Sequence, residues 1–210
     1  MPAALFVLAG VNGSGKSSIG GAALKARGVE HYDPDRFARE LRHADPGLTA
    51  EAANARAWTR GRRGLEEALS RGSTFAFETT LGARTIPALL LAGARAGPRV
   101  HVWFVGLTSP ELHLQRVRDR VLAGGHDIPE ERIRARFDTS RTNLIRLLPV
   151  LTSLRVYDNS VEADPKTGLR PQPLLLLHME AGRIVANAPL PEVPEWAKPI
   201  LAAAFARHGA

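Results

Sequence analysis

The sequence predicts an α/β protein in which a mostly parallel sheet lies between two layers of helices. Strand-like apolar runs alternate with helix-like segments along most of the chain. The first run, residues 4–9, is continuously apolar, which is typical of a central strand covered on both faces. The 210 residues, of which 44% are hydrophobic and 23% charged, suffice for one domain with an ordinary core. We therefore expect a single domain over residues 1–210.

In the first half of the chain we expect three strands separated by helices. The first strand leads through a glycine-rich loop into a helix that ends at about residue 27. A long helical region then reaches about residue 71, with a break at Pro46-Gly47 and a new cap at Thr49. The remaining elements expected here are a short second strand at 29–32, a third strand at 74–78 and a helix at 85–96.

The second half is expected to complete a five-stranded sheet. A further strand spans 100–106, and Ser109-Pro110-Glu111 opens a helix that ends at Gly124-Gly125. The next helix runs from Pro129 to about residue 148. The elements expected after it are a fifth strand at 154–157 and an appendage over about 165–210, with a loop at 165–173, a hairpin of 174–179 and 183–186 around Ala181-Gly182, and a helix at 196–207. The sequence leaves three places open for the hairpin: it extends the sheet, forms the edge of the substrate site or is buried in a dimer.

Composition excludes several classes of protein. With no cysteine, the chain has no disulfide framework, thiolate metal site or cysteine nucleophile. The first apolar run has no basic flank and no segment reaches membrane-spanning length, so we expect a cytoplasmic protein without membrane contact. The formal charge of +7 suits an anionic ligand. We expect Trp58, Trp103 and Trp196 in the core or at an interface, and without a platform for base stacking, nucleic acid is not the expected partner.

The glycine-rich loop matches the Walker A pattern at every fixed position and lies between a predicted strand and a predicted helix. Its backbone N–H groups and the helix N-terminus can cradle phosphate, Lys16 can bridge the β- and γ-phosphates, and the Ser17 hydroxyl can bind Mg²⁺. We therefore predict ATP as a ligand with Mg²⁺ as cofactor. The residues expected to contact ATP are Gly10, Val11, Asn12, Gly13, Ser14, Gly15, Lys16, Ser17 and Ser18.

Other signals favour phosphoryl transfer to a small molecule over the remaining uses of such a loop. The strand at 100–106 ends in glycine rather than in the acid typical of motor and transporter ATPases, and guanine-binding motifs are missing. Kinases acting on small molecules instead use a carboxylate base and a lid of arginines. A nucleic-acid-end kinase and an ATP-binding regulatory module without turnover stay as alternatives.

Three acidic residues follow predicted strands, at the edge of the sheet where ligands bind. Asp35 is the expected catalytic base and Asp33 an expected substrate contact, although Asp33 can instead form a turn and Asp35 cap the next helix. Glu78 and Thr80 are expected to bind substrate. Alternatively, Glu78 holds a water molecule on the magnesium ion, or Thr79 and Thr80 start the following helix.

Arginines are concentrated over about 116–141, around a Gly124-Gly125-His126 loop. Closing arginines can neutralise the charge that develops on a transferred phosphoryl group. We therefore predict an arginine-rich helical lid in which Arg120 and Arg136 are catalytic, and His126 either orders the loop or takes part in catalysis. The arginines of this region are Arg116, Arg118, Arg120, Arg132, Arg134, Arg136 and Arg141.

With these motifs placed, the chain resembles the small stand-alone branch of the zeta-toxin family of P-loop kinases. The resemblance rests on GVNGSGKSS, DPDRFARE, FAFETTLGART and GGHDIPEERIRARFDTSRTNL, within the first 160 residues; the tail after Leu154 departs from the large toxins. It implies a nucleoside-kinase-like fold, transfer of phosphate from ATP to the 3′-hydroxyl of UDP-N-acetylglucosamine, and a separate antitoxin protein as partner. It also implies that Lys16 binds phosphate, Asp35 is the base, Glu78 and Thr80 bind substrate, and the lid arginines lie near Arg120 and Arg136.

Overall fold

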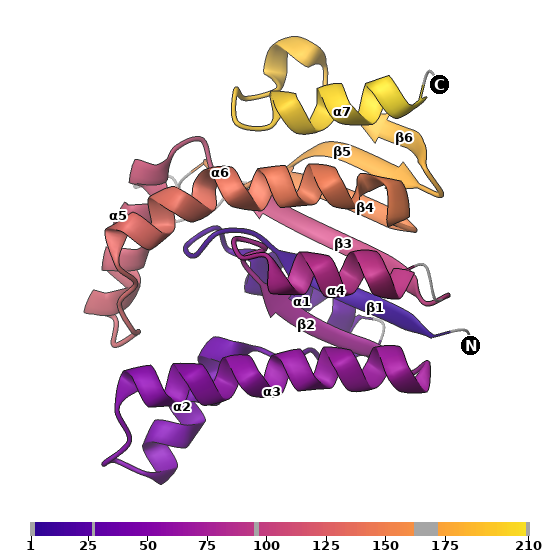
Figure 1. Ribbon diagram of the computed structural model, residues 1–210. Helices are drawn as coiled ribbons and strands as arrows, with labels where there is room; N and C mark the ends of the chain where they lie inside the picture. Colours follow the sequence, from indigo (N-terminus) through magenta and orange to yellow (C-terminus); the bar gives the residue numbers. More distant parts are fainter. Residues whose placement is uncertain (1–2, 27, 95–96, 162–171, 209–210) are drawn as a thin grey trace.

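Six strands form one sheet in the order β2-β1-β3-β4-β5-β6 (Figure 1). The computed structural model describes residues 3–26, 28–94, 97–161 and 172–208. The four strands from β2 to β4 are parallel, and β5 and β6 add to the β4 edge in antiparallel orientation. The strands are β1 (Ala4–Ala9), β2 (Phe75–Thr79), β3 (Arg99–Gly106), β4 (Ser153–Asp158), β5 (Leu174–Glu180) and β6 (Arg183–Asn187).

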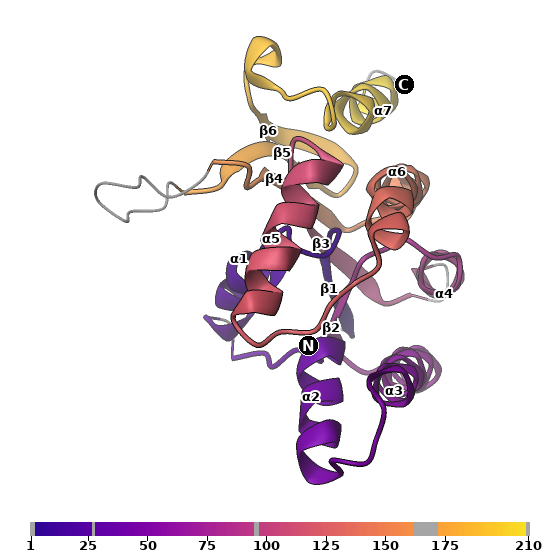
Figure 2. The same ribbon diagram turned by 90° about the vertical axis from the view of Figure 1, so that its left-hand side faces the viewer.

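Helices cover both faces of this sheet, as expected from the sequence. Figure 2 shows α1 on one side of the sheet and α3, α4, α6 and α7 along the other. Helix α2 packs along α3, and α5 packs against α6. The helices are α1 (Lys16–Lys25), α2 (Pro34–Ala44), α3 (Ala50–Arg71), α4 (Thr85–Ala94), α5 (Pro110–Leu122), α6 (Glu130–Leu147) and α7 (Lys198–His208), with short 3₁₀ turns at Leu148–Val150 and Leu190–Glu192. No helix among the described residues has an apolar stretch long enough to cross a bilayer.

The two faces of β1 contribute to two separate cores. Because successive side chains of a strand point to opposite faces, Val7 enters the large core under α3, α4, α6 and α7. Leu8 points the other way and packs with Leu24 of α1 and Trp103 of β3. Burial on both faces explains why this strand has no polar residue. The same burial fixes the position of the loop that follows β1 at the carboxyl end of the strand.

Two expectations about the sheet are wrong. The segment 29–32 is not a strand: only Tyr32 pairs with the sheet, in a single parallel bridge to Phe77. The chain leaves the sheet at once, because Asp33 caps α2. The sheet has six strands instead of five, because the C-terminal hairpin extends it, which is one of the three places that the sequence left open for this hairpin. The helix ends expected at 27 and 95–96 and most of the expected loop at 165–173 lie outside the described residues.

The tryptophans divide into two groups. Trp103 and Trp196 are 4% and 3% exposed and belong to the cores, as expected. Trp58 is 47% exposed, so it does not lie in the core, and the alternative of a place at an interface stays a prediction. It lies on α3, on the side that faces the cavity described below.

Gly10, directly after β1, is the position least able to accept a side chain. Its φ is +140°, and a Cβ there would lie 2.2 Å from the carbonyl oxygen of Val105. We expect Gly10→Ala to lower the free energy of unfolding by about 3 kcal/mol or more, because backbone strain and overlap with a backbone atom combine. Urea unfolding followed by circular dichroism measures this loss.

Gly72→Ala is the matched control. Gly72 also has a positive φ, +61°, but a Cβ at this position would meet nothing within 4 Å. Only backbone strain should therefore contribute, and Gly72→Ala should lower the free energy of unfolding by about 1 kcal/mol. Equal losses for the two variants would mean that the strand beside Gly10 yields to the new methyl group.

Candidate active site

The loop over residues 10–17, the P-loop, presents an uncapped helix N-terminus. Gly15 precedes α1 with a φ of +84°, and no side chain caps the helix. The first turn of α1 also contains no acidic residue. Its backbone N–H groups therefore remain available to an anion, and the helix dipole adds to their attraction. This geometry fits the predicted phosphate cradle.

Two cavities meet at Lys16, which lines both. The first, of about 710 Å³, lies between the P-loop and α5, and Ser17, Arg116 and Asn159 contribute to its wall. The second, of about 510 Å³, is bounded by α2, α3, the end of β2 and α6, and it contains Asp35 and Glu78. For the roles proposed below, we call the first the donor cavity and the second the acceptor cavity. The arrangement places one lysine between two spaces that are each large enough for a ligand of nucleotide size.

A third and larger cavity, of about 790 Å³, lies elsewhere. It is lined by the outer face of α3 and the start of β2 and contains no P-loop residue. Tyr32 lines both this cavity and the acceptor cavity, and its hydroxyl donates to the carbonyl oxygen of Ala57 at 2.7 Å. That hydrogen bond ties Tyr32 to α3 and fixes the wall between the two spaces.

Glu78 is a buried carboxylate between the P-loop and the segment before α2. Its two oxygens accept hydrogen bonds from Ser17 Oγ at 2.9 Å and from His31 Nε2 at 2.8 Å. Burial alone raises the pKa of Glu78, but the hydrogen bond from His31, the charge of Lys16 and the Ser17 hydroxyl together hold that pKa below its usual value. Glu78 is therefore ionised at neutral pH.

The environment of Ser17 fits a magnesium ion bound together with nucleotide phosphates. A hydroxyl and a nearby carboxylate are oxygen ligands of the kind that Mg²⁺ accepts, directly or through water. Within the described ranges, no group of three or more acidic or histidine side chains could hold a metal ion. Magnesium would therefore depend on phosphate oxygens of the nucleotide in addition to Ser17 and Glu78.

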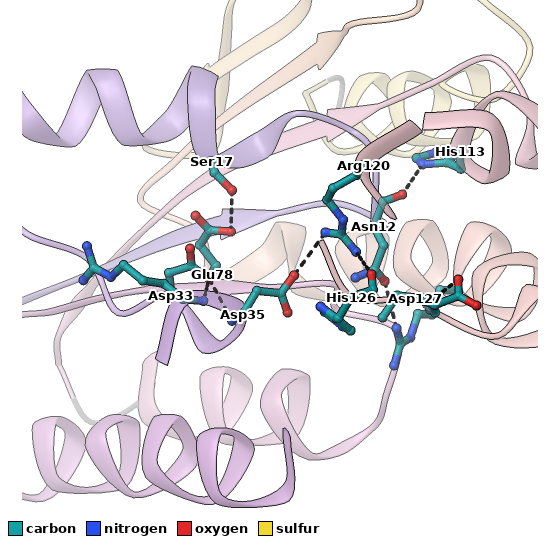
Figure 3. A network of polar contacts seen from close by, with 12 residues as sticks. Asn12, Ser17, Asp33, Asp35, Glu78, His113, Arg120, His126 and Asp127 are labelled. Carbon is teal, nitrogen blue, oxygen red and sulfur yellow. Dashed lines mark hydrogen bonds and ion pairs between the residues drawn. The ribbon is translucent and has the colours of Figure 1, made fainter. Parts of the chain in front are cut away.

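Asp33 and Asp35 have different environments. Asp33 Oδ1 accepts the backbone N–H groups of Asp35 at 2.8 Å and Arg36 at 3.1 Å, so Asp33 is the cap of α2. The alternative that Asp35 caps this helix is wrong. Asp33 is also not among the residues that line the acceptor cavity, whereas Asp35 is. With Asp33 as the cap, the Asp35 carboxylate is free of the helix terminus and points toward Arg120 (Figure 3).

Arg120 connects the base candidate to the lid loop. One guanidinium nitrogen lies 3.2 Å from Asp35 Oδ2, and the other donates to the carbonyl oxygen of His126 at 3.1 Å (Figure 3). Its buried Nε has no hydrogen-bond partner. Burial lowers the pKa of His126, so this imidazole is neutral at pH 7. The contacts bring the predicted lid arginine and the predicted base together.

Arg136 reaches the P-loop from α6. One of its terminal nitrogens donates to Asn12 Oδ1 at 2.8 Å, and it lines the acceptor cavity with Asp35. Its stem packs so closely on Gly82 that a Cβ there would lie 2.4 Å from Arg136 Cγ. Burial, followed by the neighbouring charge of Arg132, lowers the pKa of Arg136. A desolvated cation held beside the phosphate cradle is placed to interact with a phosphoryl group.

His113 supports the same part of the P-loop from α5. Its Nδ1 lies 2.8 Å from the carbonyl oxygen of Asn12. Burial is the main cause that lowers the pKa of His113 to about 4, with Lys16 and Arg116 acting in the same direction. The ring is thus neutral at pH 7, and its Nδ1–H donates to that carbonyl.

The buried His113 predicts a pH-dependent stability. Between the ordinary histidine pKa of about 6.5 and its folded value of about 4, the unfolded chain binds a proton that the folded chain does not. Stability is therefore complete above pH 6.5 and falls as the pH drops toward 4. We expect a loss of about 2 kcal/mol from this group between pH 7 and pH 5, measured by urea unfolding. His113→Gln should remove most of that difference. The exposed His43 provides the control, since His43→Gln should leave it intact.

Helix α6 positions the loop between β2 and α4. The hydroxyl of Ser140 donates to the carbonyl oxygen of Thr80, and Asn143 Nδ2 donates to those of Leu81 at 2.6 Å and Ala83 at 3.2 Å. Thr79 and Thr80 accept backbone N–H groups two residues ahead and stabilise a turn. Helix α4 begins only at Thr85, so the alternative that these threonines start it is wrong. Thr80 and Glu78 instead line the acceptor cavity.

Residues 5–143 match a protein-family model described as an AAA domain (AAA_33). The chain belongs to this family. The matched region of the AAA-domain protein contains the P-loop, Asp35, Glu78, Arg120 and Arg136. An uncharacterized protein of Haemophilus influenzae (strain ATCC 51907 / DSM 11121 / KW20 / Rd) is 30% identical to it over 129 residues, which are 61% of this chain and 88% of that protein.

Solved structures share the fold of this AAA-domain protein at low sequence identity. The AvrRxo1-ORF1:-ORF2 complex with ATP has a TM-score of 0.66 and 17% identity over 97% of this chain, which spans only 64% of that chain. The PezAT toxin–antitoxin system of Streptococcus pneumoniae has a TM-score of 0.57 and 17% identity over 100% of this chain and 86% of that chain. These similarities establish the α/β P-loop kinase fold, with the antiparallel hairpin and helix at the C-terminus.

Several residues that line the two cavities or hold their walls were missed by the sequence analysis. His31 was placed in a strand without a role, and His113 and Asn159 were not considered. Asn159 Nδ2 donates to the carbonyl oxygen of Ser14 at 2.8 Å, a contact across 145 positions that no local pattern indicates. Asn54, Trp58 and Arg62 were detectable, since they recur every fourth residue on one predicted helix.

Proposed function

We propose that this protein is an ATP- and magnesium-dependent kinase that transfers the γ-phosphate of ATP to a hydroxyl group of a nucleotide-sugar such as UDP-N-acetylglucosamine. The observation that carries the proposal is Lys16 at the junction of two cavities, one beside the P-loop and one containing Asp35. ATP occupies the first, with its γ-phosphate at the junction. The acceptor occupies the second.

In this proposal the acceptor hydroxyl lies next to Asp35, which accepts its proton as the oxygen attacks the γ-phosphorus. The bond from the γ-phosphorus to the bridging oxygen breaks, and ADP departs. Magnesium would supply charge neutralisation for the phosphates, held by Ser17 and by Glu78 through water. Lys16, Arg120 and Arg136 stabilise the charge on the transferred group. Acceptor binding must loosen the resting contact between Asp35 and Arg120.

Two of the structural relatives support ATP as the donor and an antitoxin as a partner. The AvrRxo1 complex was solved with ATP, and PezAT is a toxin–antitoxin system. A separate antitoxin protein that binds this chain, and a cytoplasmic location, stay predictions. The proposed substrate contact of Asp33 has less support, because its carboxylate caps α2.

The direct test is incubation of the purified protein with Mg-ATP and UDP-N-acetylglucosamine, followed by mass spectrometry for one added phosphate. Phosphorylated sugar nucleotide, lost in Asp35→Asn, is the expected result. ATP binding without this product would remove UDP-N-acetylglucosamine as the acceptor, and nucleotides and other sugar nucleotides would be assayed next.

A nucleic-acid end is the second candidate acceptor. The third cavity favours it, because Arg56, Arg60 and Arg63 line its wall near Tyr32, which also borders the acceptor cavity. Affinity for single-stranded DNA or RNA that falls linearly with the logarithm of salt concentration would support this candidate. Absence of measurable binding at physiological salt would eliminate it.

A further inference from the structure

One face of α3 presents three different polar or aromatic side chains to the acceptor cavity. Asn54, Trp58 and Arg62 follow one another at four-residue spacing and all line this cavity. Residues four apart lie on the same face of a helix, so the three form one stripe. An amide, an indole and a guanidinium can respectively hydrogen-bond, stack and attract negative charge.

The packing of α3 directs this stripe into the cavity. Ala57 and Gly61 precede Trp58 and Arg62 and are buried on the adjacent face, against Tyr32. The Tyr32 hydroxyl donates to Ala57 O, and a Cβ at Gly61 would lie 2.8 Å from the Tyr32 ring. A larger residue at Gly61 would push the helix away. The rotation of α3 about its axis is therefore set by Tyr32, which fixes the direction of Trp58 and Arg62.

Trp58 is exposed and braced on one side. The guanidinium carbon of Arg62 lies 5.4 Å from the indole ring centre, and Arg62 is itself held by Glu66 at 2.9 Å. A cation over one face of an indole is attracted to it, and the 47% exposed fraction of Trp58 shows that ring surface stays open to a ligand. The buried Nε of Arg62 has no hydrogen-bond partner. The pair thus offers an aromatic surface and an unsatisfied donor inside one cavity.

The charge of the acceptor cavity also points to an anionic ligand. Four cationic side chains line it, against two carboxylates: Lys16, Arg62, Arg132 and Arg136 face Asp35 and Glu78. Glu78 already accepts two hydrogen bonds, and Asp35 pairs with Arg120. The lining therefore carries two more positive than negative side chains, although Arg62 also pairs with Glu66 outside it, and this balance favours an anionic group over an uncharged sugar or polyol. A volume of about 510 Å³ accommodates a ring and a phosphate together.

We propose that Asn54, Trp58 and Arg62 form the subsite for the nucleobase and adjoining phosphate of the acceptor. The base stacks on the open face of Trp58, the Asn54 amide meets its polar edge, and Arg62 binds the phosphate. This inference rests on the proposed function, in which the cavity receives the acceptor. It makes Trp58 the residue that selects acceptors with a planar ring over small alcohols without one.

The test is direct binding, without phosphate transfer. The full-length protein is saturated with Mg²⁺ and a non-hydrolysable ATP analogue, so that added nucleotide cannot occupy the donor cavity. Uridine 5′-monophosphate, guanosine 5′-monophosphate, uridine and ribose 5-phosphate are then titrated by calorimetry. Because Trp103 and Trp196 are buried, the nucleotides should quench mainly the fluorescence of Trp58, and this quenching should disappear in Trp58→Phe.

The variants separate stacking from charge. Trp58→Ala should weaken both nucleotides and uridine by about 5- to 150-fold and leave ribose 5-phosphate unchanged, since stacking of a base contributes free energy of this order. Trp58→Phe should recover most of the affinity. Arg62→Met should weaken the nucleotides about tenfold and spare uridine. Phe205→Ala, which removes another exposed aromatic ring, on α7 at the far edge of the sheet, is the control and should change nothing.

Equal losses of affinity for ribose 5-phosphate and for the nucleotides in Trp58→Ala would overturn the proposal. Absence of binding by every ligand that carries a nucleobase would also overturn it. A loss of uridine affinity in Arg62→Met equal to that of the nucleotides would remove the phosphate contact. Failure here is distinguishable from failure of the proposed function. Nucleotide binding without any phosphate transfer would support the subsite and refute the proposed kinase activity. Transfer to an acceptor without a planar ring, unaffected by Trp58→Ala, would support the kinase activity and refute the subsite.

Discussion

Replacing Asp35 by asparagine is expected to lower the turnover number by about 10²- to 10⁴-fold, the range typical of removing a general base. Asparagine keeps the size of the side chain but cannot accept the proton of the attacking hydroxyl. Affinity for ATP should change by less than about twofold, because the phosphate cradle lies on the P-loop and not on α2. Steady-state kinetics and calorimetric titration with Mg-ATP measure the two quantities.

Asp45→Asn is the matched control for this prediction. Asp45 follows the other end of α2, is exposed, and accepts the backbone N–H of Gly47 at 3.1 Å, which asparagine can also do. Its turnover number should equal that of the unaltered protein. If ATP affinity and turnover fell together in Asp35→Asn, Asp35 would act by holding Arg120 in place instead of by accepting a proton.

Arg136→Gln is expected to produce the second large effect, a fall of about 10³-fold in turnover number or more. The guanidinium is desolvated and held against Asn12 of the P-loop, so its charge acts in a low-dielectric environment near the expected γ-phosphate. Glutamine removes the charge, and its amide ends two bonds short of the terminal nitrogen that donates to Asn12. The loss should therefore appear in turnover, with a smaller change in the Michaelis constant for ATP.

Arg134→Gln tests whether any lid arginine would give the same result. Arg134 lies two residues earlier on α6 and is exposed, with ion pairs to Glu111 and Glu130, both at 2.7 Å. Because exposed ion pairs contribute little, this variant should retain full activity. Similar losses in the two variants would show that the lid acts through its total charge, and the specific role of Arg136 would then be wrong.

Local patterns were sufficient for most of the secondary structure. The glycine loop, the continuous apolar run before it and the proline-containing helix starts each depend on neighbours in the sequence, and the structure confirms them at β1, α1 and α5. The strand predicted at 29–32 is the exception. Its composition is strand-like, but only Tyr32 pairs with the sheet, and Asp33 directly after it caps α2, so the chain turns into a helix there.

In the C-terminal hairpin, the turn could be predicted from the sequence but the pairing of its strands with the sheet could not. Its turn at Ala181-Gly182 was detectable from Gly182, because glycine readily adopts the positive φ that such turns require, and in the structure both residues adopt it. Its place beside β4 was not, since that depends on Leu154 and Met179 meeting in register across the sheet. Leu176 and Leu177 are buried as a consequence, whereas Leu174 at the start of β5 stays exposed.

A P-loop α/β chain with a base candidate, an acidic strand end and an arginine-rich lid is recognisable from the sequence. These features are encoded in short motifs whose residues are neighbours along the chain. Which of these features come into contact depends on the tertiary fold. The pairing of Asp35 with Arg120, the contact of Arg136 with Asn12 and the position of Lys16 between two cavities each join segments far apart in sequence. Such contacts depend on how helices pack on the sheet, and no local periodicity specifies that packing.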